Sequence, residues 1–293
     1  MDTKQNARIA LVTGGTSGIG LSIVRALAAS GAFVHFVGTN RDKGQRIAAE
    51  LEAAGQRGRF LRADLSSMRA VDKLARRLAG ELERLDTLVN VAGVVLPQRQ
   101  ETVDGFETTL AVDHLSALLL SRELRPLLAK GERPRIANVS GPRRQMLKPL
   151  LDFDDLQLTQ GYSFLRAVSQ GLHAKTVMTQ LLAERFAEDG IDVNAFDAGA
   201  VRSELSRNLA FPMNLLLRFV QLFMPRVSKT GIHVSTSEAL SGITGQFFYG
   251  RERVSIAFDG DYARRLWDAS EAMLASALGE ELSSPPAAPR APR

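Results

Sequence analysis

Apolar residues recur along this chain in two alternating patterns, short continuous runs and longer stretches with helical spacing. Residues 9–12 form one such run, which stops at a glycine-rich stretch, and apolar residues then recur at helical spacing as far as Leu27. The first pattern is typical of a buried strand and the second of an amphipathic helix. Further strands are predicted at 33–37, near 60–65, and at 87–90, 134–140, 191–196 and 246–249, and further helices at 42–54, 71–82, 105–129, 162–187 and 262–278.

The alternation of strands and helices predicts an α/β fold, a single Rossmann-type, doubly wound parallel sheet with helices on both faces. Ligands of such sheets bind beyond the carboxyl ends of the strands. We expect one domain over residues 1–278 and a disordered Pro/Ala/Arg-rich tail over residues 279–293.

The most apolar segment, residues 209–225, stands outside this alternation. Pro212, Asn214 and Arg218 interrupt it, and it is too short to cross a bilayer comfortably, so no integral membrane segment is expected. We predict that it belongs to a substrate cover over about residues 200–228. Core packing or a dimer face is the alternative.

Composition narrows the functional classes. The chain of 293 residues is 45% hydrophobic and 24% charged, which is ordinary for a globular protein. It has no Cys, which excludes disulfides, thiolate nucleophiles and Cys-ligated zinc, and no metal site is expected. The net charge is +5, but the Arg residues are scattered, which argues against nucleic-acid binding. The N-terminus lacks the pattern of a secretion signal, so a cytoplasmic location is expected.

The glycine-rich stretch after the first strand is the strongest candidate binding site. Gly14, Gly18 and Gly20 fall where a dinucleotide-binding turn needs unusual backbone angles, close backbone approach to a ligand and tight helix packing. The helix N-terminus adds free N–H groups and the positive end of its dipole. These features predict a pyrophosphate site, and an ordinary strand-to-helix turn is the alternative.

The tip of the second strand bears on the choice of cofactor. In dinucleotide folds an acidic residue near this point holds the ribose hydroxyls, whereas an Arg accommodates a 2′-phosphate. Here the tip carries Thr39 and Arg41, and no carboxylate occurs before Asp42. We therefore expect NADP rather than NAD.

Several motifs occur together along the chain: residues 13–20 (TGGTSGIG), 64–66 (DLS), 90–93 (NVAG) and 135–140 (RIANVS). This combination resembles the short-chain dehydrogenase/reductase family. Residues 153–156 (FDDL), 162–167 (YSFLRA) and 245–248 (GQFF) are similar to its retinol-dehydrogenase-like branch.

The resemblance covers about residues 7–278 and implies a Rossmann domain, an NAD(P)(H) cofactor and hydride transfer on hydrophobic small molecules. It also implies a homodimer or homotetramer that pairs through the helices at 105–129 and 162–187. Together with the glycine turn, it assigns cofactor binding to Gly14, Thr16, Ser17, Gly18, Ile19, Gly20, Thr39, Arg41, Asp64, Leu65, Asn90, Ala92 and Gly93.

The family's chemistry implies four side chains, a Tyr, a Lys, a Ser and an Asn. Their positions in this chain carry Val168, Leu172, Gly141 and Asp113, so the family's redox mechanism is not expected. Asp113 and Asp197 are the candidate catalytic residues, because a partly desolvated carboxylate can act as a general acid or base. Alternatively, Asp113 supports a kink in its helix and Asp197 ends a strand.

Other polar groups lie near these positions. Tyr162 precedes the family's tyrosine position by six residues, which turns it away from that helix face. Lys175 follows Leu172 by three residues, and a surface or cofactor-edge position is expected for it. His114 and His173 are expected to pack or to face solvent.

Three functions remain open at this point. The leading hypothesis is a catalytically degenerate homologue that retains the dinucleotide site. It would be a non-redox enzyme of cyclase, isomerase or lyase type, acting on a hydrophobic small molecule in specialised metabolite biosynthesis. The second is an NADP-dependent reductase of an activated acceptor, an iminium or an enone. The third is a non-enzymatic NADP(H)-binding regulatory or scaffold protein.

Overall fold

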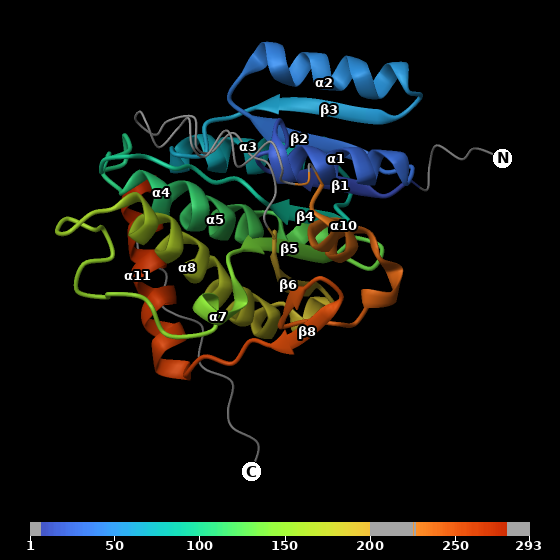
Figure 1. Ribbon diagram of the computed structural model, residues 1–293. Coiled ribbons are helices and arrows are strands. Elements are labelled where there is room, and N and C mark those ends of the chain that lie inside the picture. Colours follow the sequence, from blue (N-terminus) through green and yellow to red (C-terminus); the bar gives the residue numbers. More distant parts are fainter. Residues whose placement is uncertain (1–6, 200–224, 226, 280–293) are drawn as a thin grey trace.

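One eight-stranded sheet forms the centre of the protein, of which the computed structural model describes residues 7–199, 225 and 227–279 (Figure 1). Its strands are β1 (Ile9–Val12), β2 (Phe33–Gly38), β3 (Arg57–Arg62), β4 (Thr87–Asn90), β5 (Arg135–Ser140), β6 (Asp192–Asp197), β7 (Gln246–Tyr249) and β8 (Glu252–Ser255). They are ordered β3-β2-β1-β4-β5-β6-β7-β8, and all neighbours pair in parallel except β7 and β8. The strand order reverses between β1 and β4, which is where ligands of such sheets bind.

Helices pack on both faces of the sheet. They are α1 (Gly18–Ala29), α2 (Arg41–Ala53), α3 (Met68–Glu81), α4 (Thr108–Leu110), α5 (Ser116–Glu123), α6 (Arg125–Leu128), α7 (Arg143–Met146), α8 (Phe164–Arg185), α10 (Lys229–Thr236) and α11 (Gly260–Leu278), with a π-helical turn, η1 (Ala111–Leu115), between α4 and α5 and 3-10 turns at Ala187–Asp189 and Glu238–Leu240.

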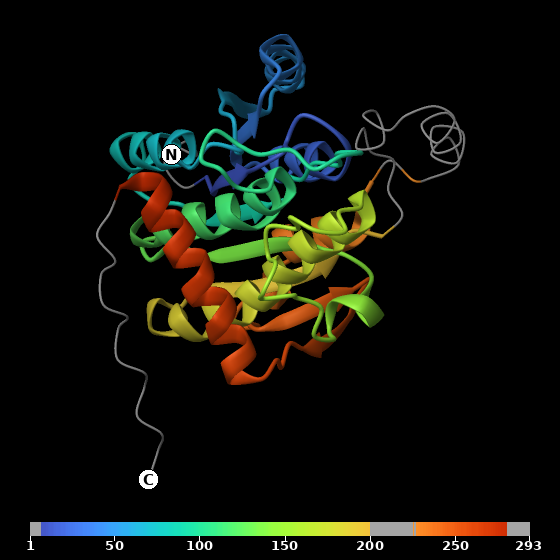
Figure 2. The ribbon, with the colours of Figure 1, turned by 90° about the vertical axis from the view of Figure 1, so that its left-hand side faces the viewer.

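Each face of the sheet has its own apolar core. On one face α1, α2 and α10 contribute buried aliphatic side chains, and on the other α3, α5, α8 and α11 do so. Figure 2 shows α11 running across the outside of the second layer, where it contacts α3 and α8. The predicted doubly wound α/β fold is confirmed.

The sequence predicted seven strands and missed β8. Its residues are exposed apart from the partly buried Val254, so no apolar run marks this strand. β8 forms because the chain turns back after β7 and pairs antiparallel with it, from Gln246 opposite Ser255 to Tyr249 opposite Glu252. The edge of the sheet is therefore a hairpin rather than a parallel strand.

The single helix predicted over residues 105–129 is wrong. The chain forms α4, η1, α5 and α6 there instead. The Glu107 carboxylate caps the start of α4 by accepting two backbone N–H groups at 2.8 and 2.7 Å. Pro126 lies in the first turn of α6, where a helix can begin but a preceding one cannot continue. The π-helical turn η1 carries Asp113 at its centre, and such turns are frequent at functional sites.

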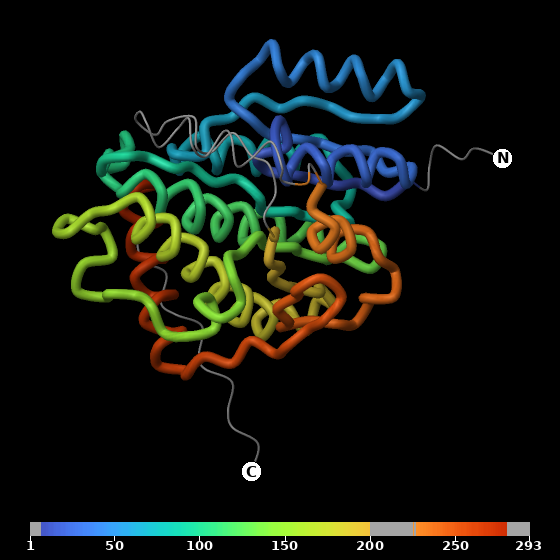
Figure 3. The backbone as a smooth tube through the Cα atoms, in the orientation of Figure 1, coloured from blue at the N-terminus to red at the C-terminus, as the bar shows by residue number. Residues whose placement is uncertain are grey.

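The connection between β5 and α8 bulges outward before the chain enters α8 (Figure 3). The sequence predicted no element between the strand at 134–140 and the helix at 162–187, and the structure adds the short helix α7 there. The Tyr262 hydroxyl of α11 accepts the backbone N–H groups of Leu150 and Leu151, each at 2.9 Å. This contact fixes the connection to the body of the protein.

Most of the predicted cover over about residues 200–228 lies outside the described residues, as does nearly all of the predicted tail. Within the described ranges, no helix combines the length and the apolar character needed to traverse a membrane.

Candidate functional site

The turn between β1 and α1 requires glycine at three positions. Gly14 has a φ of +64°, and a Cβ there would lie 2.9 Å from the Ala92 Cα. Gly18 has a φ of +49°, and a Cβ at Gly20 would lie 2.3 Å from the Gly14 carbonyl oxygen. The turn therefore packs closely against its own helix and against the segment that follows β4, as the spacing of the glycines predicted.

A cavity of about 410 Å³ opens at this turn. Its volume is in the range of small-molecule sites. The residues that line it in the described part of the chain are Gly14, Thr16, Ser17, Gly18, Ile19, Gly20, Val37, Gly38, Thr39, Asn40, Lys43, Ala63, Asp64, Leu65, Ser66, Val91, Ala92, Gly93, Val94, Val95, Thr108 and Val112. Apart from Arg41 and Asn90, every residue predicted to bind cofactor is among them.

Arg41 and Asn90 lie elsewhere. Arg41 is exposed on α2 and lines a separate surface groove of about 850 Å³ between α2 and β3. Asn90 is buried, and its amide donates to Asn138 Oδ1 at 2.9 Å and to Ser121 Oγ at 3.3 Å. Lys43, which the sequence reading did not select, lines the cavity in place of Arg41. The position of Lys43 in the first turn of the helix after the second strand could have indicated from the sequence that it lies near the cofactor site.

Positions 141, 168 and 172 carry no ionisable group. A Cβ on Gly141 would lie 3.4 Å from Leu172 Cδ1 and 3.3 Å from Met146 Sδ, so these residues meet across the sheet end. We call Gly141, Met146 and Leu172 the apolar cluster. Val168 lies one helical turn before Leu172 on α8 and is partly buried. The structure thus brings positions 141 and 172 together, in apolar surroundings.

Asp113 lies behind the cavity wall between two glycines. A Cβ on Gly93 would be 3.2 Å from Asp113 Oδ1, and a Cβ on Gly171 would be 2.9 Å from the Asp113 Cβ. The carboxylate is 2% exposed and accepts the Val94 N–H at 3.2 Å. Burial raises the pKa of Asp113 to about 7, against the opposing effect of the Lys175 charge.

Lys175 is buried, contrary to the expectation of a surface or cofactor-edge position. It is 1% exposed, and its Nζ donates to the Ala92 carbonyl oxygen at 3.4 Å. Burial lowers the pKa of Lys175 to about 8, and the Asp113 carboxylate opposes this shift. The sequence did not predict the burial of Lys175, because α8 is buried on several sides here. The spacing of an amphipathic helix indicates only one buried face.

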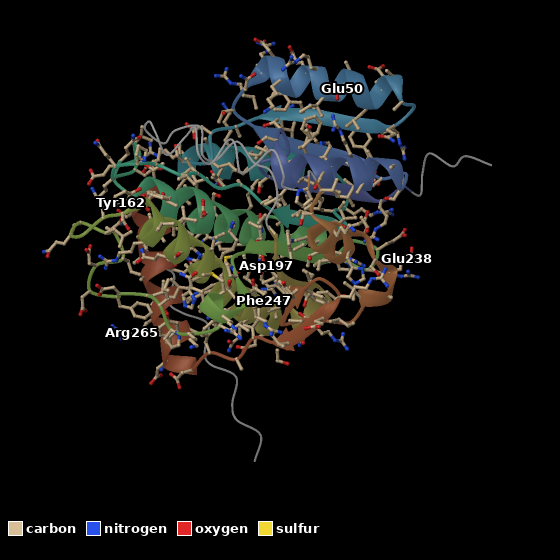
Figure 4. The ribbon with its side chains drawn as sticks, viewed as in Figure 1. Glu50, Tyr162, Asp197, Glu238, Phe247 and Arg265 are labelled. Carbon is tan, nitrogen blue, oxygen red and sulfur yellow. The ribbon has the colours of Figure 1, made fainter. Side chains whose placement is uncertain are left out.

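Asp197 ends β6, opposite Ser140 of β5. Its Oδ1 accepts the Gly199 N–H at 2.8 Å, and burial raises the pKa of its carboxyl. Asp113 lies behind the segment after β4, so different segments hold the two candidate carboxylates. Figure 4 shows Asp197 near the middle of the molecule and Tyr162 at its outer edge, where the Tyr162 hydroxyl donates to the Leu96 carbonyl oxygen at 3.0 Å.

A histidine next to the apolar cluster orders its surroundings. His173 is fully buried, and its Nδ1 lies 3.0 Å from the Met146 carbonyl oxygen. Since a carbonyl only accepts, Nδ1 carries the proton, and Nε2 accepts from the Tyr262 hydroxyl at 2.8 Å. His114 is likewise buried, with its Nε2 2.8 Å from Ser270 Oγ. Both histidines pack rather than face solvent.

Comparison with known proteins gives consistent matches. The short chain dehydrogenase family profile matches residues 8–149. Retinol dehydrogenase 12 of Bos taurus is 31% identical over 277 residues, which are 92% of this chain and 87% of that protein. The WW domain-containing oxidoreductase of Drosophila melanogaster is 31% identical over 290 residues, 94% of this chain and 70% of that protein.

A solved structure adds a ligand-bound neighbour. A proposed NAD(P)-dependent gluconate 5-dehydrogenase from Beutenbergia cavernae, with NADP bound at low occupancy, is 26% identical, with a TM-score of 0.64. The match covers 83% of this chain and 95% of that one. Relatives that are 31% identical span most of this chain, and the strand order and the glycine turn are those of a dinucleotide-binding fold. The protein therefore belongs to the short-chain dehydrogenase family, with retinol dehydrogenase-like homologues.

Proposed function

We propose that this protein binds NADP(H) in the cavity and reduces a hydrophobic acceptor that is already activated, such as an iminium or a conjugated enone. One observation carries the proposal. The cavity lined by the predicted dinucleotide-binding residues includes the segment after β4, and the apolar cluster includes Gly141, directly after the neighbouring strand β5. The names of the relatives are those of oxidoreductases, and one solved neighbour holds NADP. These comparisons favour hydride transfer over the non-redox hypothesis.

The lining of the cavity fits a nicotinamide dinucleotide. Gly14 lets the turn pack closely against the Ala92 backbone, where a Cβ would lie 2.9 Å from the Ala92 Cα, and the N-terminus of α1 offers free N–H groups to a pyrophosphate. Lys43 lines the cavity together with Thr39 and Asn40 at the tip of β2. A cation at this end favours a 2′-phosphate, which supports NADP over NAD.

The apolar cluster restricts the acceptor. A nicotinamide held at this cavity would supply a hydride, and the reduction of a ketone would also require a proton. We infer that Val168 and Leu172 occupy the places of the family's Tyr and Lys, so this chain offers no proton donor there. An iminium that accepts a hydride becomes a neutral amine and needs no proton. An enone takes the hydride at its β-carbon and a proton at its α-carbon from solvent.

Calorimetry with NADPH and NADH tests the nucleotide site. Gly14→Ala and Gly31→Ala form a matched pair, because both glycines have positive φ, +64° and +92°. A Cβ on Gly31 meets no atom within 4 Å, whereas one on Gly14 meets Ala92. We expect wild type and Gly31→Ala to bind NADPH more tightly than NADH, and Gly14→Ala to bind at least about tenfold more weakly, a loss of about 1.4 kcal/mol. Equal affinities of the two variants would contradict a nucleotide at this turn.

NADPH oxidation with cyclic iminiums, conjugated enones and matched saturated ketones tests the chemistry. We expect turnover of the first two classes and reduction of the ketones slower by roughly 10²-fold or more, the usual contribution of a general acid. The triple variant Gly141→Ser, Val168→Tyr and Leu172→Lys is expected to narrow this difference. Wild-type ketone reduction at the rate of the enones would exclude the proposal.

A non-redox step is the second candidate, favoured by the buried Asp113 carboxyl, whose pKa is raised to about 7. It requires that substrate disappears from the same assays without NADPH oxidation. Asp113→Asn combined with Asp197→Asn should then abolish turnover, because the amides that replace the two candidate carboxylates do not exchange protons as an acid or a base. Turnover that persists in the double variant would remove this candidate.

A further inference from the structure

We propose that Lys175 and Asp113 form a positioning pair, which holds residues 92–94 in place from behind the nucleotide cavity. The inference rests on the proposed function only in taking this cavity as the nucleotide site. Neither residue lines the cavity; both act through the backbone that does.

The two side chains make hydrogen bonds to the backbone on either side of Gly93. Lys175 Nζ donates to the carbonyl oxygen of Ala92 at 3.4 Å, and Asp113 Oδ1 accepts the N–H of Val94 at 3.2 Å. Ala92, Gly93 and Val94 all line the cavity. A donor from α8 and an acceptor from η1 therefore set the position of three consecutive wall residues, and hydrogen bonds to charged groups are stronger than neutral ones.

The surrounding packing is shaped for this pair. Gly93 and Gly171 are the two residues whose missing side chains leave room for Asp113, with Cβ positions 3.2 and 2.9 Å from its atoms. The Thr13 hydroxyl, directly after β1, accepts the N–H of Ala92 at 3.1 Å, so the near end of the segment is held from this side as well. At the far end, the Asp113 carboxylate accepts the N–H of Val94.

The charge of the pair depends on pH. Burial raises the pKa of Asp113 and lowers the pKa of Lys175, so protonation of the carboxylate at lower pH leaves the ammonium alone, and deprotonation of the ammonium at higher pH leaves the carboxylate alone. Two other titratable groups lie around the pair. The Glu107 carboxylate is held by backbone N–H groups of α4, and burial lowers the pKa of His114 to about 3, so that it stays neutral. The two groups therefore carry opposite charges, and make both hydrogen bonds, only at intermediate pH.

Hydrogen exchange of the nucleotide-free protein tests the pair directly. We expect Lys175→Met to speed exchange in the peptide covering residues 91–95 by about tenfold or more, the effect of losing one hydrogen bond to a charged group. Val177→Ala is the matched control, because Val177 is also fully buried on α8 but carries no charge. Equal exchange of this peptide in the two variants would overturn the proposal.

The pH profile provides a readout that general loss of structure does not produce. Exchange of the same peptide in wild type, corrected for intrinsic rates, should be slowest at intermediate pH and faster at both lower and higher pH. Asp113→Asn combined with Lys175→Met leaves no lone buried charge, so this variant should fold, and its profile should be flat. A wild-type profile that persists in the double variant would also overturn the pair.

Nucleotide affinity separates this inference from the proposed function. If wild type binds NADPH, Lys175→Met should bind it at least about tenfold more weakly, while Val177→Ala keeps its affinity within a few-fold. Absence of wild-type binding would refute the proposed function and leave the exchange result to judge the pair.

Discussion

At the scale of single residues, His173 is the clearest example of a side chain whose protonation state is set by its partners. Its ring is buried beside Phe258 and Tyr262, with ring centroids 5.2 and 5.9 Å away. Its Nδ1 donates a hydrogen bond to the Met146 carbonyl oxygen, and its Nε2 accepts one from the Tyr262 hydroxyl. Burial lowers the pKa of His173 to about 4, although the Met146 hydrogen bond favours the charged form.

This burial predicts an acid sensitivity of the folded protein. Between about pH 6.5 and 4 the unfolded chain binds a proton at position 173 that the folded protein does not, so stability is lost as the pH falls below 6.5. From pH 8 to pH 5 this amounts to about 2 kcal/mol for one histidine. Urea unfolding should show a loss smaller by about that amount in His173→Gln than in wild type. His233→Gln is the control: burial lowers the pKa of His233 as well, but at a partly buried site, so this variant should change the loss by less than His173→Gln does. An unaltered acid loss in His173→Gln would show that His173 is not held neutral.

At the scale of elements, the contact between α8 and η1 determines how closely the π-helical turn approaches the cavity. Gly171 lies at this contact, and a Cβ there would be 2.9 Å from the Asp113 Cβ. Neither the helical spacing of α8 nor the helix predicted over 105–129, with its possible kink at Asp113, indicated the contact with Gly171. Both patterns report which residues are apolar, whereas a π-helical turn arises from how the flanking helices are packed.

Replacing this glycine tests the contact. Gly→Ala in a helix interior normally stabilises by up to about 1 kcal/mol, and Gly80→Ala in α3, where a Cβ meets nothing within 4 Å, should do so. Gly171→Ala should instead destabilise by about 1–3 kcal/mol, because the added methyl overpacks a close contact. Denaturant midpoints of the two variants give the comparison. A stabilised Gly171→Ala would mean that α8 and η1 can separate freely.

At the scale of the whole molecule, the sequence predicted the α/β fold but not the strand β8 at one edge of the sheet. A strand was found at each apolar run, although β3 begins earlier in the chain than the run near 60–65 and only its Leu61 is buried. β8 has no such run and depends on β7 for its formation. The oligomeric state, the cytoplasmic location, the tail and the substrate cover remain predictions.

The sequence by itself determined the α/β class and the glycine turn, since hydrophobic periodicity and a requirement for positive φ are properties of neighbouring residues. Only the tertiary structure decided that Lys175 and Asp113 are both buried, that Lys43 rather than Arg41 lines the cavity, and that Gly141 meets Leu172. Each of these facts joins segments far apart in the chain. Burial and the pKa shifts that follow from it depend on such packing, which no local pattern encodes.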